Sequence, residues 1–354
     1  MGRQNLGYSR KVLVFKRLKN LATLPSRPRP PVGATPHVVV HAENKWRLLR
    51  FLPRPHGTNC GIPVLLVPSL INRYYVLDLT RGKSFAESLV AHGFDVFCID
   101  WGQPTAEDRF QTFDDIADRA LARALRRVCE VAGVPQAHVL GYCLGGTLAA
   151  IHTALHPERV ASLTCVAAPI AFEHAGIMRT WLTGDGFDID ALVNGFGLLP
   201  AALLQFSFQL LRPTLGLSKA VNLVDRAWND KFLDGYLALE TWANDNVAIP
   251  GEFYRTYVRE LYQRDALCHG QLTVAGQRVN LGAIRCPLLC VTFSVDAIAP
   301  AACCAPLLEL CGSQDKRLVH FEGSHVGGMT SSPAAKGLWP QIFGFWHSLP
   351  SPAK

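Results

Sequence analysis

The segment that most constrains this 354-residue chain is Gly141-Tyr142-Cys143-Leu144-Gly145, a glycine-flanked turn around a cysteine. It continues the apolar run 137–142 and precedes a stretch containing Ala and Leu that extends to about Leu155. A buried strand that turns at once into a helix needs small residues on both sides of the turning residue, because larger ones would collide. The pattern predicts a strand–turn–helix unit that projects the side chain of Cys143 above the sheet.

Apolar runs and helical patterns alternate along most of the chain. A hairpin is expected over residues 37–51, around Asn44. Continuous apolar runs are typical of strands buried on both faces of a parallel sheet, and strand–helix alternation builds such a sheet. The expected strands are 63–68, 94–100, 137–142, 160–168, 287–293 and 317–321, and the expected helices are 85–92, 116–128, 144–155, 302–311 and 335–348. The sequence therefore predicts an α/β fold with a mostly parallel sheet and helices on both faces.

The alternation stops between residues 172 and 263, where Leu, Phe and Trp are frequent. Helix-like patches occur there at 201–211 and 253–262, and strand–helix alternation resumes after Ile284. We interpret this stretch as a mainly helical cap inserted into one α/β domain. The expected units are a basic, proline-rich arm (1–36), the α/β core (37–171 and 264–354) and the cap (172–263).

Composition excludes several protein classes. Hydrophobic residues make up 49% of the chain and charged residues 18%, which excludes wholesale disorder, a coiled coil and a collagen-like fibre. No run of about 18 apolar residues is present, so no membrane-spanning helix is expected. The 11 cysteines are an odd number, and the first residues lack the apolar stretch of a secretory signal. We therefore expect a reducing cytoplasm in which most thiols are buried packing residues.

The positive charge is concentrated in the N-terminal arm. The formal net charge is +7, and the first 30 residues contain eight basic side chains and no acidic one. Five prolines between Pro25 and Pro36 predict an extended linker. A basic arm favours an anionic surface such as phospholipid, nucleic acid or the acidic face of a partner protein. A solubilising tail and an organellar transit peptide are the alternative interpretations.

The glycine-flanked cysteine matches the nucleophile-elbow pattern G-x-S-x-G of the α/β-hydrolase fold, with cysteine in place of serine. In that fold an acid and then a histidine follow the nucleophile along the chain. Asp296 follows the expected strand 287–293, and His325 lies in a glycine-rich loop after the last expected strand. Each of these residues, taken alone, has a structural interpretation. Cys143 could be a buried residue at a turn, Asp296 could cap a turn, and His325 could be a histidine of a surface loop. Together, in this order, they predict a Cys-His-Asp triad, with the backbone N–H of Leu144 lining an oxyanion hole.

Neither a metal nor a nucleotide cofactor is predicted. No phosphate-binding glycine loop is present, and the cysteines near the late strands lack zinc-site spacing. Those cysteines are Cys286, Cys290, Cys303, Cys304 and Cys311. Structural roles are expected for His138, His320, Asp100 and Asp315, which lie in or beside strands and turns.

A thiol nucleophile favours acyl transfer over hydrolysis. Attack on a thioester substrate exchanges one thioester for another with little change in free energy, so the enzyme-bound acyl group stays activated for attack by an alcohol. Water must be kept away from that intermediate, and the apolar cap is suited to do so. The predicted site therefore fits acyl transfer from acyl-thioesters.

Several motifs then resemble polyhydroxyalkanoate synthases, most closely the short catalytic subunits of the two-subunit, class III-like type. The resemblance spans roughly residues 64–345. It rests on Gly141 to Gly146, Val67 to Asn72 with Arg73-Tyr74-Tyr75, Asp100-Trp101-Gly102-Gln103-Pro104, Trp242-Ala243-Asn244-Asp245, Ile249-Pro250-Gly251, Leu261-Tyr262, Val279-Asn280-Leu281, Asp296 with Pro300, and Gly323 to Gly327.

The resemblance implies a role for each candidate residue. Cys143 would take the acyl group from an (R)-3-hydroxyacyl-CoA, and His325 would activate Cys143. Asp296 would orient His325 or help to activate the 3-hydroxyl of the incoming unit. The N–H groups of Leu144 and of the Ser69–Leu70 region, Leu70 being our choice, would bind the oxyanion. Coenzyme A thioester is then the substrate, with no cofactor required.

The same resemblance implies a polyester chain, a second synthase subunit and a granule surface as partners, a homo-oligomer as a further option, and no nucleic acid. Three departures from the family pattern bear on substrate chain length and partner dependence. Ala297 replaces the usual histidine after the aspartate, Ser324 precedes His325 where glycine is more usual, and the long basic, proline-rich N-terminus has no match in the short class. Two alternatives stay open on the shared fold: an intracellular polyester depolymerase or thioesterase, and an inactive granule-associated scaffold protein.

Overall fold

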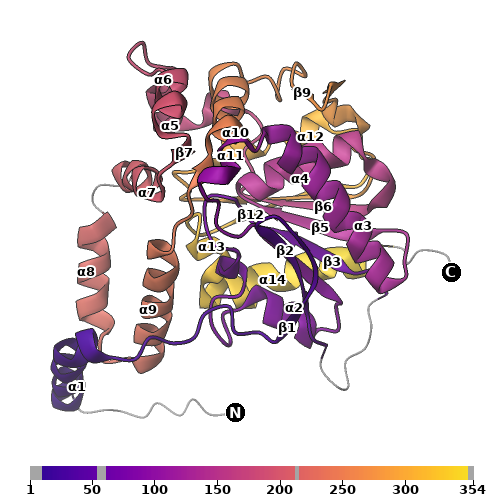
Figure 1. The fold of residues 1–354 in the computed structure, drawn as a ribbon. Helices are drawn as coiled ribbons and strands as arrows, with labels where there is room; N and C mark the ends of the chain where they lie inside the picture. Colours follow the sequence, from indigo (N-terminus) through magenta and orange to yellow (C-terminus); the bar gives the residue numbers. More distant parts are fainter. Residues whose placement is uncertain (1–9, 54–60, 212–214, 350–354) are drawn as a thin grey trace.

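The computed structural model describes residues 10–53, 61–211 and 215–349. Its centre is an eight-stranded sheet in the order β1-β2-β4-β3-β5-β6-β11-β12, with helices on both faces (Figure 1). The strands are β1 (His37–Glu43), β2 (Trp46–Phe51), β3 (Val64–Val67), β4 (Val96–Asp100), β5 (Ala137–Tyr142), β6 (Val160–Val166), β11 (Leu288–Phe293) and β12 (Lys316–Phe321). Every strand expected from the sequence is present, with small shifts at the ends.

The sheet is parallel from β4 to β12, and the β1–β2 hairpin extends it antiparallel through β2–β4. Asn44 makes the hairpin turn with φ 50°, a conformation that asparagine tolerates better than most residues. The central strands β3 and β5 are neighbours. Because parallel strands end at the same edge, the loop after β3 and the turn after β5 lie side by side there.

The helices of the α/β core match the expected positions except at 302–311 and at 327–330, where the sequence predicted no helix. They are α2 (Phe85–Ala91), the π-helical η4 (Asp115–Ala120), α3 (Leu121–Ala132), α4 (Leu144–Leu155), α11 (Ala301–Cys304), α12 (Leu307–Leu310), α13 (Gly327–Thr330) and α14 (Ser332–His347). The single helix expected over 302–311 is wrong: a turn at Ala305 and Pro306 separates α11 from α12. Proline has no N–H for the helical hydrogen bond and its ring crowds the preceding turn, so the helix restarts there.

Residues 172–263 are mainly helical. They form α5 (Gly176–Thr183), α6 (Ile189–Phe196), α7 (Ala201–Leu210), α8 (Leu215–Arg226), α9 (Asp230–Asn244), α10 (Gly251–Thr256) and the π-helical η7 (Tyr257–Gln263). A short ladder joins β7 (Leu198–Leu199) to β8 (Ile249–Pro250). Helices α5 to α9 lie on the left of Figure 1, with α8 farthest from the sheet.

The N-terminal arm contains an element that the sequence reasoning did not predict. Residues Arg10–Thr23 form helix α1, followed by the short turn η1 (Leu24–Ser26). The helix lies against the lower ends of α8 and α9 (Figure 1). Asn20, which is buried, donates to the carbonyl of Ala227 at 2.7 Å, and Arg27 binds the carboxylates of Asp230 and Asp234. The arm is therefore folded back onto the cap.

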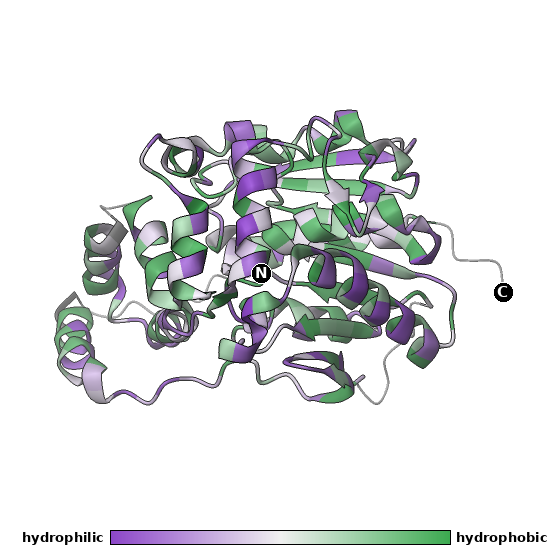
Figure 2. Ribbon diagram, turned by 45° about the horizontal axis from the view of Figure 1, so that its top comes forward, coloured by the Kyte–Doolittle hydropathy of each residue, from purple (hydrophilic) through white to green (hydrophobic). Residues whose placement is uncertain are grey.

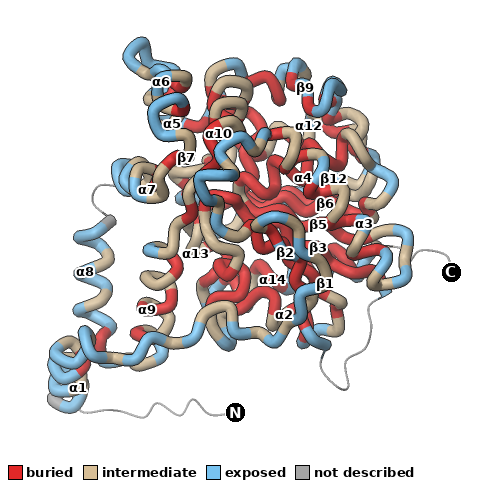
Figure 3. The backbone as a smooth tube through the Cα atoms, in the orientation of Figure 1, coloured by how far each residue is buried: buried red, intermediate tan, exposed pale blue. Residues whose placement is uncertain are grey.

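The core is formed by the sheet and the helices that cover it. All residues of β3, β4, β5 and β11 are buried, which is why these segments read as unbroken apolar runs. Figure 2 shows hydrophobic residues along the strands, and Figure 3 shows burial concentrated there, whereas α1 and α8 are mostly exposed. Within the described residues, no helix combines the length and apolar character needed to cross a membrane.

Candidate active site

Cys143 lies at the turn between β5 and α4, with φ 56° and ψ −133°. A positive φ is unfavourable for a residue with a side chain, so the surroundings must hold it. The Cys143 N–H donates to the carbonyl of Val166 at 2.9 Å, and its own carbonyl accepts from the N–H of Gly146 at 2.8 Å. This strained, doubly anchored backbone is the nucleophile elbow that the sequence predicted.

The two glycines after the elbow are required by close backbone approaches. A Cβ on Gly145 would collide with the carbonyl oxygens of Val67 and Pro68 at the end of β3. A Cβ on Gly146 would collide with the side chain of Ala168. The first turn of α4 is therefore packed directly against the loop that follows β3, which brings that loop next to Cys143.

His325 is fixed from two sides. Its Nδ1 lies 2.7 Å from Oδ2 of Asp296, and because a carboxylate accepts, Nδ1 carries the proton in this pair. The hydroxyl of Tyr142, the residue before the elbow cysteine, donates to the backbone carbonyl of His325 at 3.0 Å. The two rings pack with centroids 5.3 Å apart. The other ring nitrogen, Nε2, is left for Cys143.

Asp296 uses both of its carboxylate oxygens. Oδ2 bonds His325, and Oδ1 accepts the N–H groups of Ile298 and Ala299, each at 2.9 Å. Its side chain is fully buried. The turn-capping and triad interpretations of this residue are therefore compatible, because a different oxygen serves each.

The three side chains interact electrostatically. Burial alone would lower the pKa of His325, but the charge and hydrogen bond of Cys143 and the hydrogen bond and charge of Asp296 outweigh burial and raise the pKa to about 10. The structure thus brings Cys143, His325 and Asp296 together, with the cysteine beside an imidazole that a carboxylate orients. Their catalytic role stays a prediction at this point.

The candidate oxyanion donors lie where the two central strands end. Leu144 is the first residue of α4, and Leu70 follows the stretch of β3 that contacts Gly145. Among the described residues, neither backbone N–H has a hydrogen-bond acceptor. The indole N–H of Trp101 donates to the carbonyl of Pro68 at 2.9 Å, which holds the start of this loop. That bond gives the Asp100-Trp101-Gly102 motif a structural role.

A polar clamp connects the loop after β3 to the cap, and sequence reasoning missed it. The indole N–H of Trp242 donates to the carbonyl of Arg73 at 3.0 Å. The carboxylate of Asp245 accepts the hydroxyl of Tyr75 at 2.5 Å and pairs with Arg73. These residues belong to the motifs that resemble the synthase family. The sequence alone does not indicate that residues about 170 positions apart are in contact. The cap therefore holds the loop that carries Leu70.

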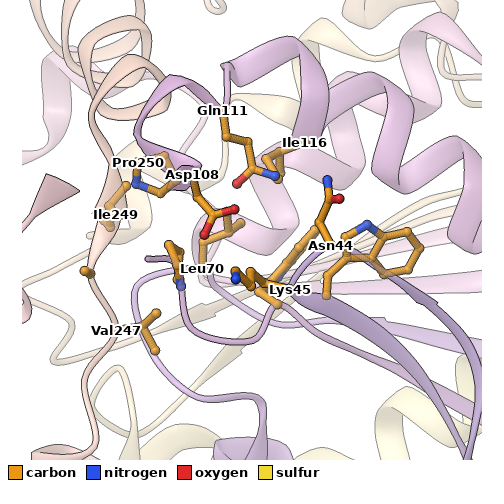
Figure 4. A pocket seen from close by; sticks show the side chains of 13 residues that line it. Asn44, Lys45, Leu70, Asp108, Gln111, Ile116, Val247, Ile249 and Pro250 are labelled. Carbon is orange, nitrogen blue, oxygen red and sulfur yellow. The ribbon is translucent and has the colours of Figure 1, made fainter. Parts of the chain in front are cut away.

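A small cleft opens beside this loop (Figure 4). Leu70 and Lys45 face it from the core, and Val247 and Ile249 face it from the end of the cap. No member of the triad lines it. Within the triad, Asp296 and His325 are buried, whereas Cys143 is partly exposed.

The other singled-out residues have structural partners. Nδ1 of His138 lies 2.8 Å from the hydroxyl of Ser162, and burial with the charge of His347 lowers its pKa to about 4. His320 pairs with the hydroxyl of Thr292. Asp100 accepts the N–H of Gly102 and pairs with Arg47, and Asp315 pairs with Arg317.

Most other described cysteines are buried, unlike the partly exposed Cys143. Burial raises the pKa of the thiols of Cys98, Cys165 and Cys290, which keeps them protonated and unreactive. They fit the packing role that the composition suggested.

Comparison with known proteins identifies the family. A family model described as the alpha/beta hydrolase fold matches residues 62–324, and one described as the poly-beta-hydroxybutyrate polymerase (PhaC) N-terminus matches residues 30–89. The poly(3-hydroxyalkanoate) polymerase subunit PhaC of Allochromatium vinosum is 33% identical over 318 residues, covering 89% of this chain and 88% of that protein. The chain belongs to the PhaC polymerase family. As a PhaC family member it is an enzyme of the acyltransferase type.

A second relative and a solved structure are also similar to this chain. The PhaC subunit of Haloferax mediterranei is 32% identical over 313 residues, and the match covers 88% of this chain but 63% of that longer protein. The monoacylglycerol lipase of Paleococcus ferrophilus superposes with a TM-score of 0.51 at 16% identity, covering 87% of this chain and all of that one. The lipase likeness shows the α/β-hydrolase fold alone, which confirms the predicted fold class.

Proposed function

We propose that this PhaC family member polymerises (R)-3-hydroxyacyl-CoA into polyester, with Cys143 carrying the growing chain as a thioester. The observation that supports this most is the contact of a thiol elbow with an imidazolium oriented by a buried carboxylate. A thioester on Cys143 stays activated toward an alcohol, whereas a serine ester would not.

The acylation step follows from the geometry. The Cys143 thiolate attacks the thioester carbonyl of the substrate, and its oxygen takes negative charge near the N–H groups of Leu144 and Leu70. The carbon–sulfur bond to coenzyme A then breaks, and the imidazolium of His325 gives its Nε2 proton to the leaving thiolate. The products are the Cys143 acyl-thioester, neutral His325 and free coenzyme A.

Elongation uses the same groups in reverse. Neutral His325 accepts the proton of a 3-hydroxyl group, whose oxygen attacks the Cys143 thioester. Collapse breaks the carbon–sulfur bond at Cys143, forms an ester and restores the thiolate–imidazolium pair. Asp296 acts by orienting His325 in this scheme, because its Oδ2 bonds Nδ1 of His325 while its Oδ1 accepts the N–H groups of Ile298 and Ala299.

The cap supports transfer to an alcohol over transfer to water. Buried aromatic rings of Phe172, Tyr257 and Tyr262 pack together at the cap–core junction, and the charge of Cys143 acts on both tyrosines. Buried aromatic rings near Cys143 raise the cost of admitting water to the acyl-enzyme. The depolymerase alternative requires water at that position.

The deciding experiment incubates the purified chain with 3-hydroxybutyryl-CoA and follows both free coenzyme A and insoluble polyester. We expect both products from the wild type and from Cys268→Ala, a control that removes another partly exposed thiol. We expect Cys143→Ala to lose at least about 10³-fold in rate. Free 3-hydroxybutyrate without polymer would instead support the hydrolase, and no coenzyme A release across chain lengths, with or without a second subunit, would support the scaffold.

We further propose a class III-like partnership with a second synthase subunit and location at a polyester granule in the cytoplasm, with no cofactor needed for turnover. Exposed apolar side chains on α1, α7 and α8 support contact with a hydrophobic surface: Phe15, Leu18, Phe206, Leu217 and Val221. Sedimentation with polyester particles tests this, and a Phe15→Ser/Leu217→Ser double variant should bind at least several-fold less. Equal sedimentation of the wild type and the double variant would contradict the proposed contact with the polyester surface.

A further inference from the structure

A cluster of two histidines and a carboxylate lies at the opposite end of α4 from Cys143. His152 is in the last turn of α4, His156 follows the helix, and Asp118 belongs to the π-helical η4. One ligand atom from each of these three residues lies within 4.8 Å of the others. Histidines four residues apart share one face of a helix, and η4 packs against that face. None of the three has a part in the acyl-transfer scheme.

The hydrogen bonding of His152 is that of a metal-binding histidine. The residue is 96% buried, and its Nδ1 lies 3.2 Å from the carbonyl of Ala117. A carbonyl only accepts, so Nδ1 carries the proton and Nε2 presents a lone pair. No described residue hydrogen-bonds that Nε2. Metal-binding histidines usually donate their second N–H to a backbone carbonyl in this way.

The side chains of His156 and Asp118 complete the cluster and are partly exposed to solvent. Nε2 of His156 lies 2.6 Å from Oδ1 of Asp118, and these side chains are 31% and 20% exposed. An ion could therefore enter from solvent and replace this single hydrogen bond, with the His156 proton then carried on Nδ1. Two imidazoles and one carboxylate, with a fourth position open to water, form a donor set that zinc accepts.

We propose that His152, His156 and Asp118 bind one divalent transition-metal ion of the zinc class. The ion would tie the end of α4 to η4, and so brace the helix that carries the nucleophile at its other end. A second group, Glu173, Asp265 and His269, differs because both oxygens of Asp265 already accept backbone N–H groups. His152 and His156 are not among the candidate metal ligands that the sequence suggested, which were all cysteines.

The test titrates the full chain with zinc chloride in a Cys143→Ala background, which removes the thiolate that could itself bind zinc. Isothermal titration should give one ion per chain, and zinc should raise the melting temperature. His152→Asn should weaken binding by about 10–100-fold and abolish the melting shift. His92→Asn, which changes an exposed histidine outside the cluster, should leave both unchanged.

A second variant and a second metal keep the test decisive. If His152→Asn disturbs folding because the residue is buried, His156→Gln replaces it, since that side chain is partly exposed. Cobalt should give the absorption of a nitrogen–oxygen site without the charge-transfer band of a cobalt–thiolate bond. No stoichiometric binding, a thiolate band, or binding that survives both histidine variants would overturn the proposal.

Discussion

His325 takes part in every contact of the candidate triad, and its protonation can be measured directly. Removing the Cys143 thiol leaves burial opposed by Asp296 alone, so we expect Cys143→Ala to lower the pKa of His325 from about 10. Nitrogen chemical shifts of labelled histidine, assigned with His325→Gln, report this value. His138, whose pKa is lowered to about 4 by burial, is an internal control that should not move. A pKa that stays near 10 would show that Cys143 does not act on His325.

The same pKa predicts how stability depends on pH. Folding raises the pKa of His325 from 6.5 to about 10. The stability that this shift gives the folded state is therefore fully present below pH 6.5 and is lost as pH rises to about 10. The difference in free energy of unfolding between wild type and His325→Gln should therefore shrink across this range. Urea unfolding at several pH values measures it. A difference that is constant with pH would contradict the assignment.

Asp296 tests the division of labour within the triad. Asp296→Asn keeps the size of the side chain but favours the wrong tautomer of His325, so we expect coenzyme A release to slow by roughly 10²–10⁴-fold. A single-turnover measurement separates acylation from elongation. If the first coenzyme A leaves at the normal rate and only polymer growth fails, Asp296 acts on the substrate hydroxyl and the orienting role is wrong.

Individual residues of the site could be predicted from sequence where steric crowding requires a particular residue type. The elbow glycines and the order of nucleophile, acid and histidine follow from crowding at a strand–helix turn and from the order of strand ends. The double use of the Asp296 carboxylate was not predictable, because it depends on the path of the loop from Ala297 to Ala299.

At the scale of elements, the clamp between the cap and the loop after β3 should affect catalysis. Trp242→Phe keeps a large ring but removes the N–H that donates to the carbonyl of Arg73. Losing one such bond costs about 1 kcal/mol, so we expect kcat to fall roughly 5-fold with KM little changed. Trp228→Phe, at a tryptophan with an exposed ring between α8 and α9, is the control. An unchanged kcat in Trp242→Phe would limit the clamp to a structural role.

Elements were predictable from sequence where local pattern and burial agree, as in β3 and β5. The break between α11 and α12 has a local cause in Pro306, which the pattern of apolar residues concealed. Helix α1 has no such local signal. Its stabilising partners are about 200 residues away, on α8, α9 and the turn between them, and a sequence pattern does not record contacts at that separation.

For the whole molecule, the attachment of the arm to the cap can be weakened at one residue. Arg27 contacts two carboxylates, those of Asp230 and Asp234, and is mostly buried. Arg27→Ala should destabilise the docked arm by about 1 kcal/mol and speed hydrogen exchange in residues 12–23 roughly 5-fold. Arg29→Ala, which removes a hydrogen bond only to the exposed hydroxyl of Thr241, is the matched control. Equal exchange in the two variants would contradict the assigned role of Arg27.

The docked arm also makes the outer part of the molecule respond to ionic strength. The sheet is held by buried apolar contacts, which salt does not weaken. The arm is held in part by the partly exposed pairs of Lys16 and Arg27 with acidic residues of α9. At 1 M salt the screening length is about 3 Å, so these attractions fade. Raising salt should therefore loosen the arm and leave the catalytic core intact, and much of the basic charge near the N-terminus would then become available to other surfaces.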